Sequence, residues 1–435
     1  MPTPSNISSP LALLAIGVTE LVNPFMGFAM SFLSGSVSYC RFRVVGGSPK
    51  RLDDNLMEKF RAHAVGKQRV MRSDREEVGW TGGRHLLDRD FDADKNVILD
   101  CLHLGMRIDA SKVPPELMRA YLQMELDSLR EKSANGNARG FAKLKKQAAE
   151  AARTRVEGEI KEGRYRSQRA FPILWDTRGD VLYLGSTSPA VIERLHRLFR
   201  ESFDKRLEPL TAGQAAYLWA ESAGASRRVE SASPARFVPQ PDGNGHAEVW
   251  WSTKDPASRD YLGNEFALWL WYTLSEENDT LTLADGTETA AVIVKNLTLE
   301  CPWSQFGKAV MTADGPSRLG ESRIAASTGK LPRKFGLILT RQEEQYELTL
   351  SAESLNVTGA VLSPLDETGP NRAEERIEQV RHLAATIDGV YHSFLAKRLS
   401  SDWEVELEKI RVWLGRSSNW RPAEMRSTQD ELMTA

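Results

Sequence analysis

The feature that most constrains the fold is a pair of long helical segments in the first half of the chain. Residues 115–132, PELMRAYLQMELDSLREK, begin with a proline, which is favoured in the first turn of a helix. After the breaker SANGNARG, the apolar residues of 140–162 recur at every third or fourth position. This apolar stripe consists of Phe141, Leu144, Ala148, Ala152, Val156 and Ile160. Two helices joined by a short Gly/Asn loop predict an antiparallel hairpin that projects as a finger.

Strand and helix patterns alternate on both sides of this finger, which predicts an α+β fold. Residues 36–45 alternate between apolar and polar side chains, as a half-buried strand does. Further strands are predicted at 97–109 and in two β-hairpins, and helices at 188–203 and 373–399. The hairpins are RAFPILWD with DVLYLGST, and the segment KFGLILTRQEEQYELTLS. The block FALWLW is apolar throughout and is expected to be buried.

At 435 residues the chain is long enough for several domains. We expect an apolar extension at 1–29, an α+β region at 30–110, and a region at 111–210 that holds the finger, a β-hairpin and a helix. These are followed by a central region at 211–300 with a separating loop at 222–245, and by a β-hairpin and helix region at 301–400. A C-terminal tail at 401–435 completes the chain, and its last fifteen residues or so are expected to be loose. The extension lacks the basic region of a secretory signal, and it contains Glu20 and Pro24, which do not suit a membrane-spanning helix. Because MSFLSGSVSYCRFRVVG begins a credible strand, Met26 or Met30 is the predicted natural start, and a signal or anchor is the alternative.

Charge is balanced overall but not locally. The chain has 57 basic and 59 acidic residues, a formal net charge of −2. Between Arg139 and Arg169, however, ten basic residues accompany only four acidic ones. Three widely separated cysteines support neither a disulfide framework nor a zinc module, and a cytoplasmic location is predicted.

Motifs for phosphate, dinucleotide and metal binding are incomplete. The segment IAASTGKLP lacks the first glycine and the hydroxyl residue of a P-loop, and GNGHAE lacks a third glycine for a Rossmann turn. No pair of histidines has zinc-ligand spacing. We therefore predict a protein without a catalytic centre and without a cofactor.

One acidic cluster keeps an enzymatic alternative open. It consists of Asp88, Asp90, Asp92 and Asp94. Ala93 and Leu99 occupy positions where an EF-hand loop needs glycine and glutamate, so calcium binding of that type is not expected. With one further carboxylate the cluster could hold magnesium for a nuclease. The other interpretation is a solvated turn before a strand.

The basic residues of the finger suggest a second function. On the helix, Arg139, Lys143, Lys146, Arg153 and Lys161 fall on the side opposite the apolar stripe. Glu150 and Glu157 share that side, so an ordinary solvated helix with i,i+4 ion pairs is an alternative. A protein-interaction scaffold, in which the finger binds a partner helix, is another. Beyond the helix, Arg164, Arg166 and Arg169 are expected to have no acidic neighbours, which favours nucleic-acid binding.

The order of these elements resembles the RdgC family of recombination-associated DNA-binding proteins, over about residues 30 to 400. The resemblance is carried by the initial MSFL strand, EEVGW before the strand ending in MRID, the finger, and GRYRSQRAFPILWDTRGDVLYLGSTS with its helix. The FALWLW block and TGKLPRKFGLILTRQEEQYELTLSAESLNVTGAVL with a long helix complete it. Leu331 departs from the family pattern, and 221–245 does not match clearly.

The resemblance implies a ring- or horseshoe-shaped homodimer that encloses duplex DNA without sequence preference and restrains a RecA-type recombinase in the nucleoid. Tyr165, eleven residues before Asp176, matches the aromatic residue of the family's basic stretch, and Gly329 with Lys330 matches its Gly-Lys. The apolar blocks FALWLW and FGLILT are also consistent with a dimer interface. The residues predicted to contact DNA are Lys143, Lys146, Arg153, Arg164, Tyr165, Arg166, Arg169, Lys330, Arg333 and Lys334.

Overall fold

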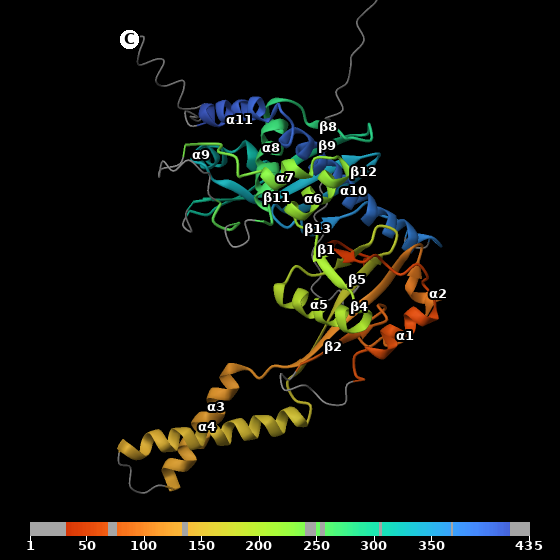
Figure 1. Ribbon diagram of the computed structural model, residues 1–435. Coiled ribbons are helices and arrows are strands. Elements are labelled where there is room, and N and C mark those ends of the chain that lie inside the picture. The colour runs from red at the N-terminus through yellow and green to blue at the C-terminus, as the bar shows by residue number, and fades with distance from the viewer. Residues whose placement is uncertain are drawn as a thin grey trace, which may run out of the picture.

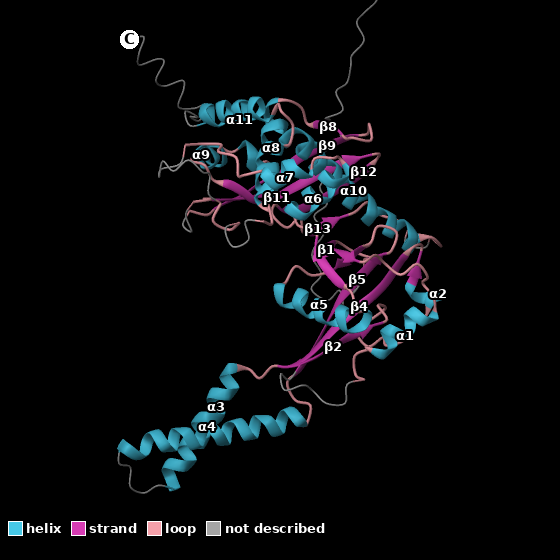
Figure 2. Cartoon of the chain, in the orientation of Figure 1, coloured by secondary structure: helices cyan, strands magenta, loops and turns pink. Residues whose placement is uncertain are grey.

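Two lobes and a long helical finger make up the molecule (Figure 1). The structure is a computed structural model that describes residues 32–67, 76–132, 138–239, 249–252, 257–303, 307–366 and 369–417. The predicted extension at 1–29 therefore lies outside the described residues. Helices and strands occur together in each lobe, as expected for an α+β fold, whereas the finger contains only helices (Figure 2).

The first lobe comprises residues 37–111 and 166–209. Its elements are β1 (Val37–Val45), α1 (Asp54–Ala62), β2 (Glu76–Thr81), α2 (Ala93–Asn96), β3 (Val97–Ile98), β4 (Cys101–Ser111), β5 (Arg166–Asp176), β6 (Val181–Leu184), α5 (Pro189–Phe203) and β7 (Arg206–Pro209). The predicted boundary between 110 and 111 falls within β4, and strands from both sides of it share one core.

The second lobe follows from residue 211. Its elements are α6 (Ala212–Ser222), α7 (Ser226–Ser231), α8 (Tyr261–Glu276), β8 (Thr280–Thr282), β9 (Glu288–Glu300), β10 (Ala309–Ala313), η2 (Pro316–Arg318), α9 (Gly320–Ser327), β11 (Leu331–Arg341), β12 (Glu344–Ser351), β13 (Val357–Val361), α10 (Arg372–Arg398) and α11 (Trp403–Ser417). Both predicted β-hairpins and the helix at 373–399 are confirmed as β5–β6, β11–β12 and α10.

One antiparallel sheet runs through both lobes, in the order β10-β9-β11-β12-β13-β1-β6-β5-β4-β2. Strand β1 joins the two halves, because Val37 and Tyr39 pair with β13 whereas Cys40 to Arg43 pair with β6. Alternate side chains of one strand point to opposite faces. In β5, Trp175 accordingly enters the core of the first lobe, while Leu174 joins the core of the second.

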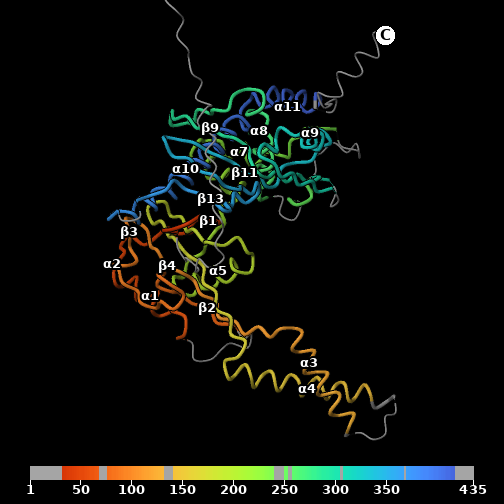
Figure 3. Tube along the Cα trace, turned by 180° about the vertical axis from the view of Figure 1, so that it is seen from behind, coloured from red at the N-terminus to blue at the C-terminus, as the bar shows by residue number. Residues whose placement is uncertain are grey.

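The finger consists of α3 (Pro115–Lys132) and α4 (Ala138–Lys161) and is inserted between β4 and β5. These two strands pair residue for residue from Cys101 with Asp176 to Ser111 with Arg166. The chain therefore leaves and re-enters the sheet at the same point. Both views show the finger extending from the first lobe, away from the second (Figures 1 and 3).

Helix α8 forms the centre of the second lobe. Residues 261–273 are buried on every side of the helix, which confirms that the FALWLW block is internal. Strand β11, which contains FGLILT, is paired on both edges, with β9 and β12. Both apolar blocks are thus covered within a single chain and need no second copy to cover them.

Two further predictions for the second lobe are corrected. The described part of the supposed separating loop contains α7, and Val229 and Phe237 belong to the lobe's core. The region predicted as a C-terminal tail begins with α11, whose Trp403, Leu407 and Trp413 are buried in the same core. Both errors have the same cause. A short or charged segment with a weak local pattern can still form a stable helix when it packs against an apolar surface of the folded protein. The last residues, 418–435, lie outside the described part.

Candidate nucleic-acid interface

Helix α4 has one buried face and one basic face. Ala148, Ala152 and Val156 are fully buried, which confirms the core of the predicted apolar stripe. Phe141, at the far end of the finger, is instead 44% exposed. Lys143, Lys146 and Arg153 are exposed on this helix. The small alanines allow α3 to approach closely, while the long basic side chains reach into solvent.

The finger is an antiparallel hairpin with polar contacts along its length. Near its base, the Tyr121 hydroxyl donates to Glu159 Oε1 at 2.8 Å, and the Arg155 guanidinium lies 4.4 Å from the centre of the Tyr121 ring. Near its far end, Arg130 lies 5.1 Å from the centre of the Phe141 ring. Positive charge is concentrated on one helix, because α4 has seven basic and three acidic residues, whereas α3 has three basic and four acidic ones.

Tyr165 closes the neck where the finger joins the sheet. Its hydroxyl donates to Glu159 Oε2 at 2.5 Å, and its carbonyl oxygen accepts from the Lys112 amide at 3.1 Å. The backbone of Tyr165 is left-handed, with φ of 64°, a conformation that a bulky residue rarely adopts without support. Hydrogen bonds from Tyr165 and Tyr121 lower the pKa of Glu159. The structure thus gives the Tyr165 hydroxyl a role in holding the foot of the finger.

The prediction that the arginines after α4 have no acidic neighbours is wrong for two of them. Arg164 lies 3.5 Å from Glu159 Oε1 and 3.4 Å from Glu162 Oε2. Arg166 donates to Asp109 Oδ2 at 2.9 Å, although its side chain stays 45% exposed. Each guanidinium therefore already has a carboxylate partner.

Asp109 is the centre of a buried polar cluster at the neck. It accepts two hydrogen bonds from Arg107 at 2.6 Å, and others from Arg166 and Gln168. Burial raises the pKa of Asp109, but the hydrogen bonds from Arg107 and Gln168 outweigh burial and the pKa is lowered. The cluster was missed by sequence reasoning. Its only sequence signal is the i,i+2 spacing of Arg107 and Asp109 in a strand, which places both on one face.

Arg169 lies on the other face of β5. It pairs with Ile108 in β4, whereas Gln168 pairs with Asp109, so the two side chains point in opposite directions. Arg169 is exposed. The three arginines at 164, 166 and 169 therefore do not form a single patch.

The second predicted basic strip consists of Lys330, just before β11, and of Arg333 and Lys334 within β11, which lies in the other lobe (Figure 1). Arg333 is held by Glu300 Oε2 at 2.9 Å, by Glu353, and by the Trp251 ring, whose centre is 4.3 Å away. Lys334 is exposed and Lys330 is half-buried. Within one chain, this strip is separated from the finger by the length of the first lobe.

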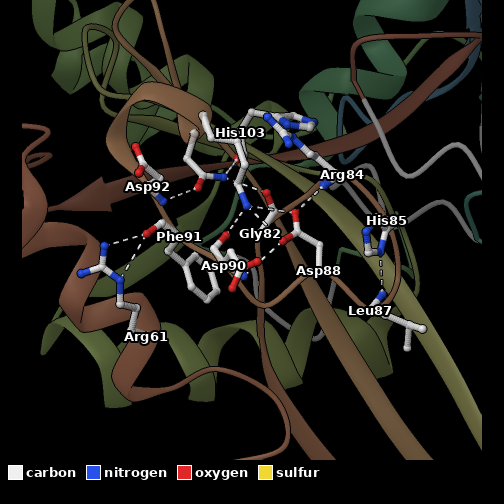
Figure 4. Close-up of polar contacts among 12 residues, drawn as sticks. Arg61, Gly82, Arg84, His85, Leu87, Asp88, Asp90, Phe91, Asp92 and His103 are labelled. Atoms are coloured by element: carbon white, nitrogen blue, oxygen red, sulfur yellow. Dashed lines mark hydrogen bonds and ion pairs between the residues drawn. The ribbon is translucent and has the colours of Figure 1, made fainter.

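The acidic cluster is a folded loop in which the carboxylates have different partners (Figure 4). Asp88 is buried and accepts from the amides of Arg84 and Asp90, both at 3.1 Å, and from Lys95 Nζ at 3.0 Å. Asp92 is the N-cap of α2 and accepts from the Asp94 amide. Among the described residues, no group of three or more His, Cys, Asp or Glu side chains is placed to hold a metal ion.

A comparison with protein-family models gives no match for this chain, and a comparison with curated proteins gives none either. None of the helices in the described ranges combines the length and hydropathy needed to cross a bilayer.

Proposed function

We propose that this protein binds duplex DNA without sequence preference, through the exposed basic face of α4. The observation that carries the proposal is the position of that face. Lys143, Lys146 and Arg153 lie exposed on a helix that projects from the body of the molecule, with their charges directed into solvent. Lysine and arginine at such a surface replace the cations condensed on DNA phosphates, and this mode of binding does not read the base sequence.

The finer proposal follows from the resemblance to the RdgC family. A cytoplasmic, nucleoid-associated homodimer would bring two fingers to one DNA molecule in a ring or horseshoe and would restrain a RecA-type recombinase. Pairing two copies would double the number of basic faces available to the duplex. Because both apolar blocks are internal, other surfaces would have to form the dimer contact. Light scattering at micromolar concentration tests the dimer, and a monomer would contradict the ring.

A salt titration of DNA binding tests the central proposal. We expect Lys143→Ala, Lys146→Ala and Arg153→Ala together to weaken binding similarly on unrelated duplex sequences. Each lost phosphate contact flattens the slope of log affinity against log salt by about 0.9, so the triple variant should lose about two to three units of slope.

The matched control removes three exposed arginines from the first lobe, by Arg197→Ala, Arg200→Ala and Arg206→Ala. This control variant should retain the affinity and the slope of the wild type. A folded α4 variant with unchanged affinity and slope would contradict the proposal and favour a protein-interaction scaffold. Metal-dependent nicking of plasmid that Asp90→Asn with Asp92→Asn abolishes would favour the nuclease alternative.

A further inference from the structure

A polar pocket in the second lobe is lined by an unusual number of arginines. It has a volume of about 540 Å³ and lies between the segment 228–236, which begins in α7, and the junction of α10 with α11. Its lining contains four arginines, four serines and a single carboxylate, Glu404. The arginines are Arg228, Arg236, Arg398 and Arg411. The pocket is separate from the proposed DNA-binding face, since α7 and α11 lie at the opposite end of the molecule from the finger (Figures 1 and 3).

Three of these arginines are oriented by main-chain carbonyl groups across the pocket. Arg228 donates to Leu399 O at 2.9 Å, and Arg398 donates to Ser233 O at 2.8 Å. Arg411 donates to Arg236 O at 2.9 Å. Each contact links one wall of the pocket to the other. A carbonyl group fixes the direction of a guanidinium but leaves its positive charge in place.

Carboxylates neutralise only part of this charge. Arg398 forms a buried ion pair with Glu265 at 2.5 Å, and its guanidinium lies 4.8 Å from the centre of the Trp403 ring. Arg411 pairs with Glu408 at 3.2 Å near the surface. Among the described residues, the structure shows no ion pair to Arg228, which lines the pocket and is exposed. An anion with several oxygens could accept hydrogen bonds from the remaining N–H groups of these arginines.

The first residues of helix α11 form part of the pocket wall. The helix begins at Trp403 and is 15 residues long. The pocket is lined by Trp403 and Glu404 in its first turn, and by Ser400 and Ser401 just before it. The first turn of a helix carries free amide groups and the positive end of the helix dipole, which favour an anion there. Glu404 and Glu406 in this turn offset part of that potential, so the arginines carry the argument for an anion. The hydroxyls of Ser231, Ser400 and Ser401 already donate to oxygens of this chain, so the arginines are the main donors that the pocket offers to a ligand.

We infer that this pocket binds the phosphate group of a small phosphorylated molecule. The planar guanidinium group presents paired donors that match the spacing of phosphate oxygens. The volume falls in the range of about 300 to 1,000 Å³ that is usual for small-molecule sites. This site does not depend on the proposed DNA binding.

Calorimetry with inorganic phosphate and with adenosine 5′-monophosphate, in a phosphate-free buffer at constant ionic strength, tests the inference. Wild-type protein should bind both probes, and adenosine should not bind. Arg228→Ala should weaken phosphate binding by about tenfold or more, the loss expected for a charge-assisted hydrogen bond. Arg227→Ala is the matched control, because Arg227 is an exposed neighbour on α7 outside the pocket lining, and it should bind as the wild type does.

Two additional variants guard against a folding defect. Arg228→Lys keeps the charge without the paired donors and should also weaken binding, while Arg411→Gln should weaken it from the opposite wall. Phosphate should raise the thermal midpoint of the wild type more than chloride at equal ionic strength does.

The inference is overturned if the wild type binds neither probe, or if Arg227→Ala and Arg228→Ala have equal effects. It is also overturned if Arg228→Ala flattens the salt slope of duplex binding, since the phosphate would then come from DNA. Loss of DNA binding in the α4 triple variant with unchanged phosphate binding would separate the two sites.

Discussion

The outer face of α4 and the neck of the finger use basic residues in opposite ways. On α4, Lys143 and Lys146 are directed into solvent. At the neck, Arg166 is bound to the buried carboxylate of Asp109, and Arg164 to Glu159. A basic residue near a buried carboxylate stabilises the fold, whereas one directed into solvent is available to a polyanion. The number of arginines in a stretch of sequence therefore does not show which of them are available to the proposed DNA ligand.

The largest expected effect comes from removing the carboxylate at the centre of the neck. Asp109→Ala would leave Arg107, which is 5% exposed, without its bidentate partner. Breaking a buried ion pair from one side costs about 3 to 5 kcal/mol of the free energy of unfolding. Urea unfolding measures this loss. An unchanged unfolding midpoint would show that the neck does not depend on this cluster.

Acid should weaken the same cluster. The pKa of Asp109 is lowered in the folded protein, so its contribution to stability is fully present above the unfolded-state pKa of about 3.9. That contribution is lost as the pH falls through the lower folded-state pKa. We therefore expect the free energy of unfolding to decline below about pH 4, and to decline less in Asp109→Asn. Equal pH profiles for the two proteins would assign the acid sensitivity to other groups.

The neck arginines should contribute less to DNA binding than the α4 face. We expect Arg164→Ala with Arg166→Ala to flatten the salt slope by less than about 0.9, the value for one phosphate contact. The double variant should instead lower the thermal midpoint, because Asp109 and Glu159 lose partners. The comparison between the two regions fails if this variant flattens the slope as much as the α4 triple variant does.

The smallest effect is expected at Tyr165. Tyr165→Phe removes the hydroxyl that donates to Glu159 while it keeps the aromatic ring. Amide hydrogen exchange in the last turns of α4 should become faster, and affinity for single-stranded and duplex DNA should stay unchanged. Base stacking by the ring predicts a different pattern, in which Tyr165→Ala, but not Tyr165→Phe, weakens single-stranded binding by about 1 to 3 kcal/mol.

Ion pairs also hold the two lobes together. Arg41 in β1 pairs with Asp388 in α10 at 2.6 Å, and Arg381 in α10 pairs with Asp176 in β5 at 2.8 Å. Helix α10 thus contacts both halves of the continuous sheet. Arg41 and Asp388 are 347 residues apart in the chain, and nothing in the local pattern around either one indicates the pairing.

The sequence by itself determined the features that depend on local periodicity. The recurrence of Ala148, Ala152 and Val156 at helical spacing predicts both the buried face of α4 and the basic face opposite it, because a helix repeats every 3.6 residues. The β-hairpins were also predictable from local sequence, because short polar turns separate mainly apolar runs of strand length.

Only the tertiary structure decided which basic residues are neutralised by a carboxylate and which remain free to bind a ligand. Asp109 is 57 residues from Arg166, and Glu300 is 33 residues from Arg333, and each carboxylate reaches its arginine because the sheet brings separate strands together. Tertiary packing also placed α11 and the segment after α7 against the core of the second lobe, although their sequences show only weak apolar periodicity. A carboxylate distant in sequence can neutralise an arginine as effectively as an adjacent one, because ion pairing depends on distance in space.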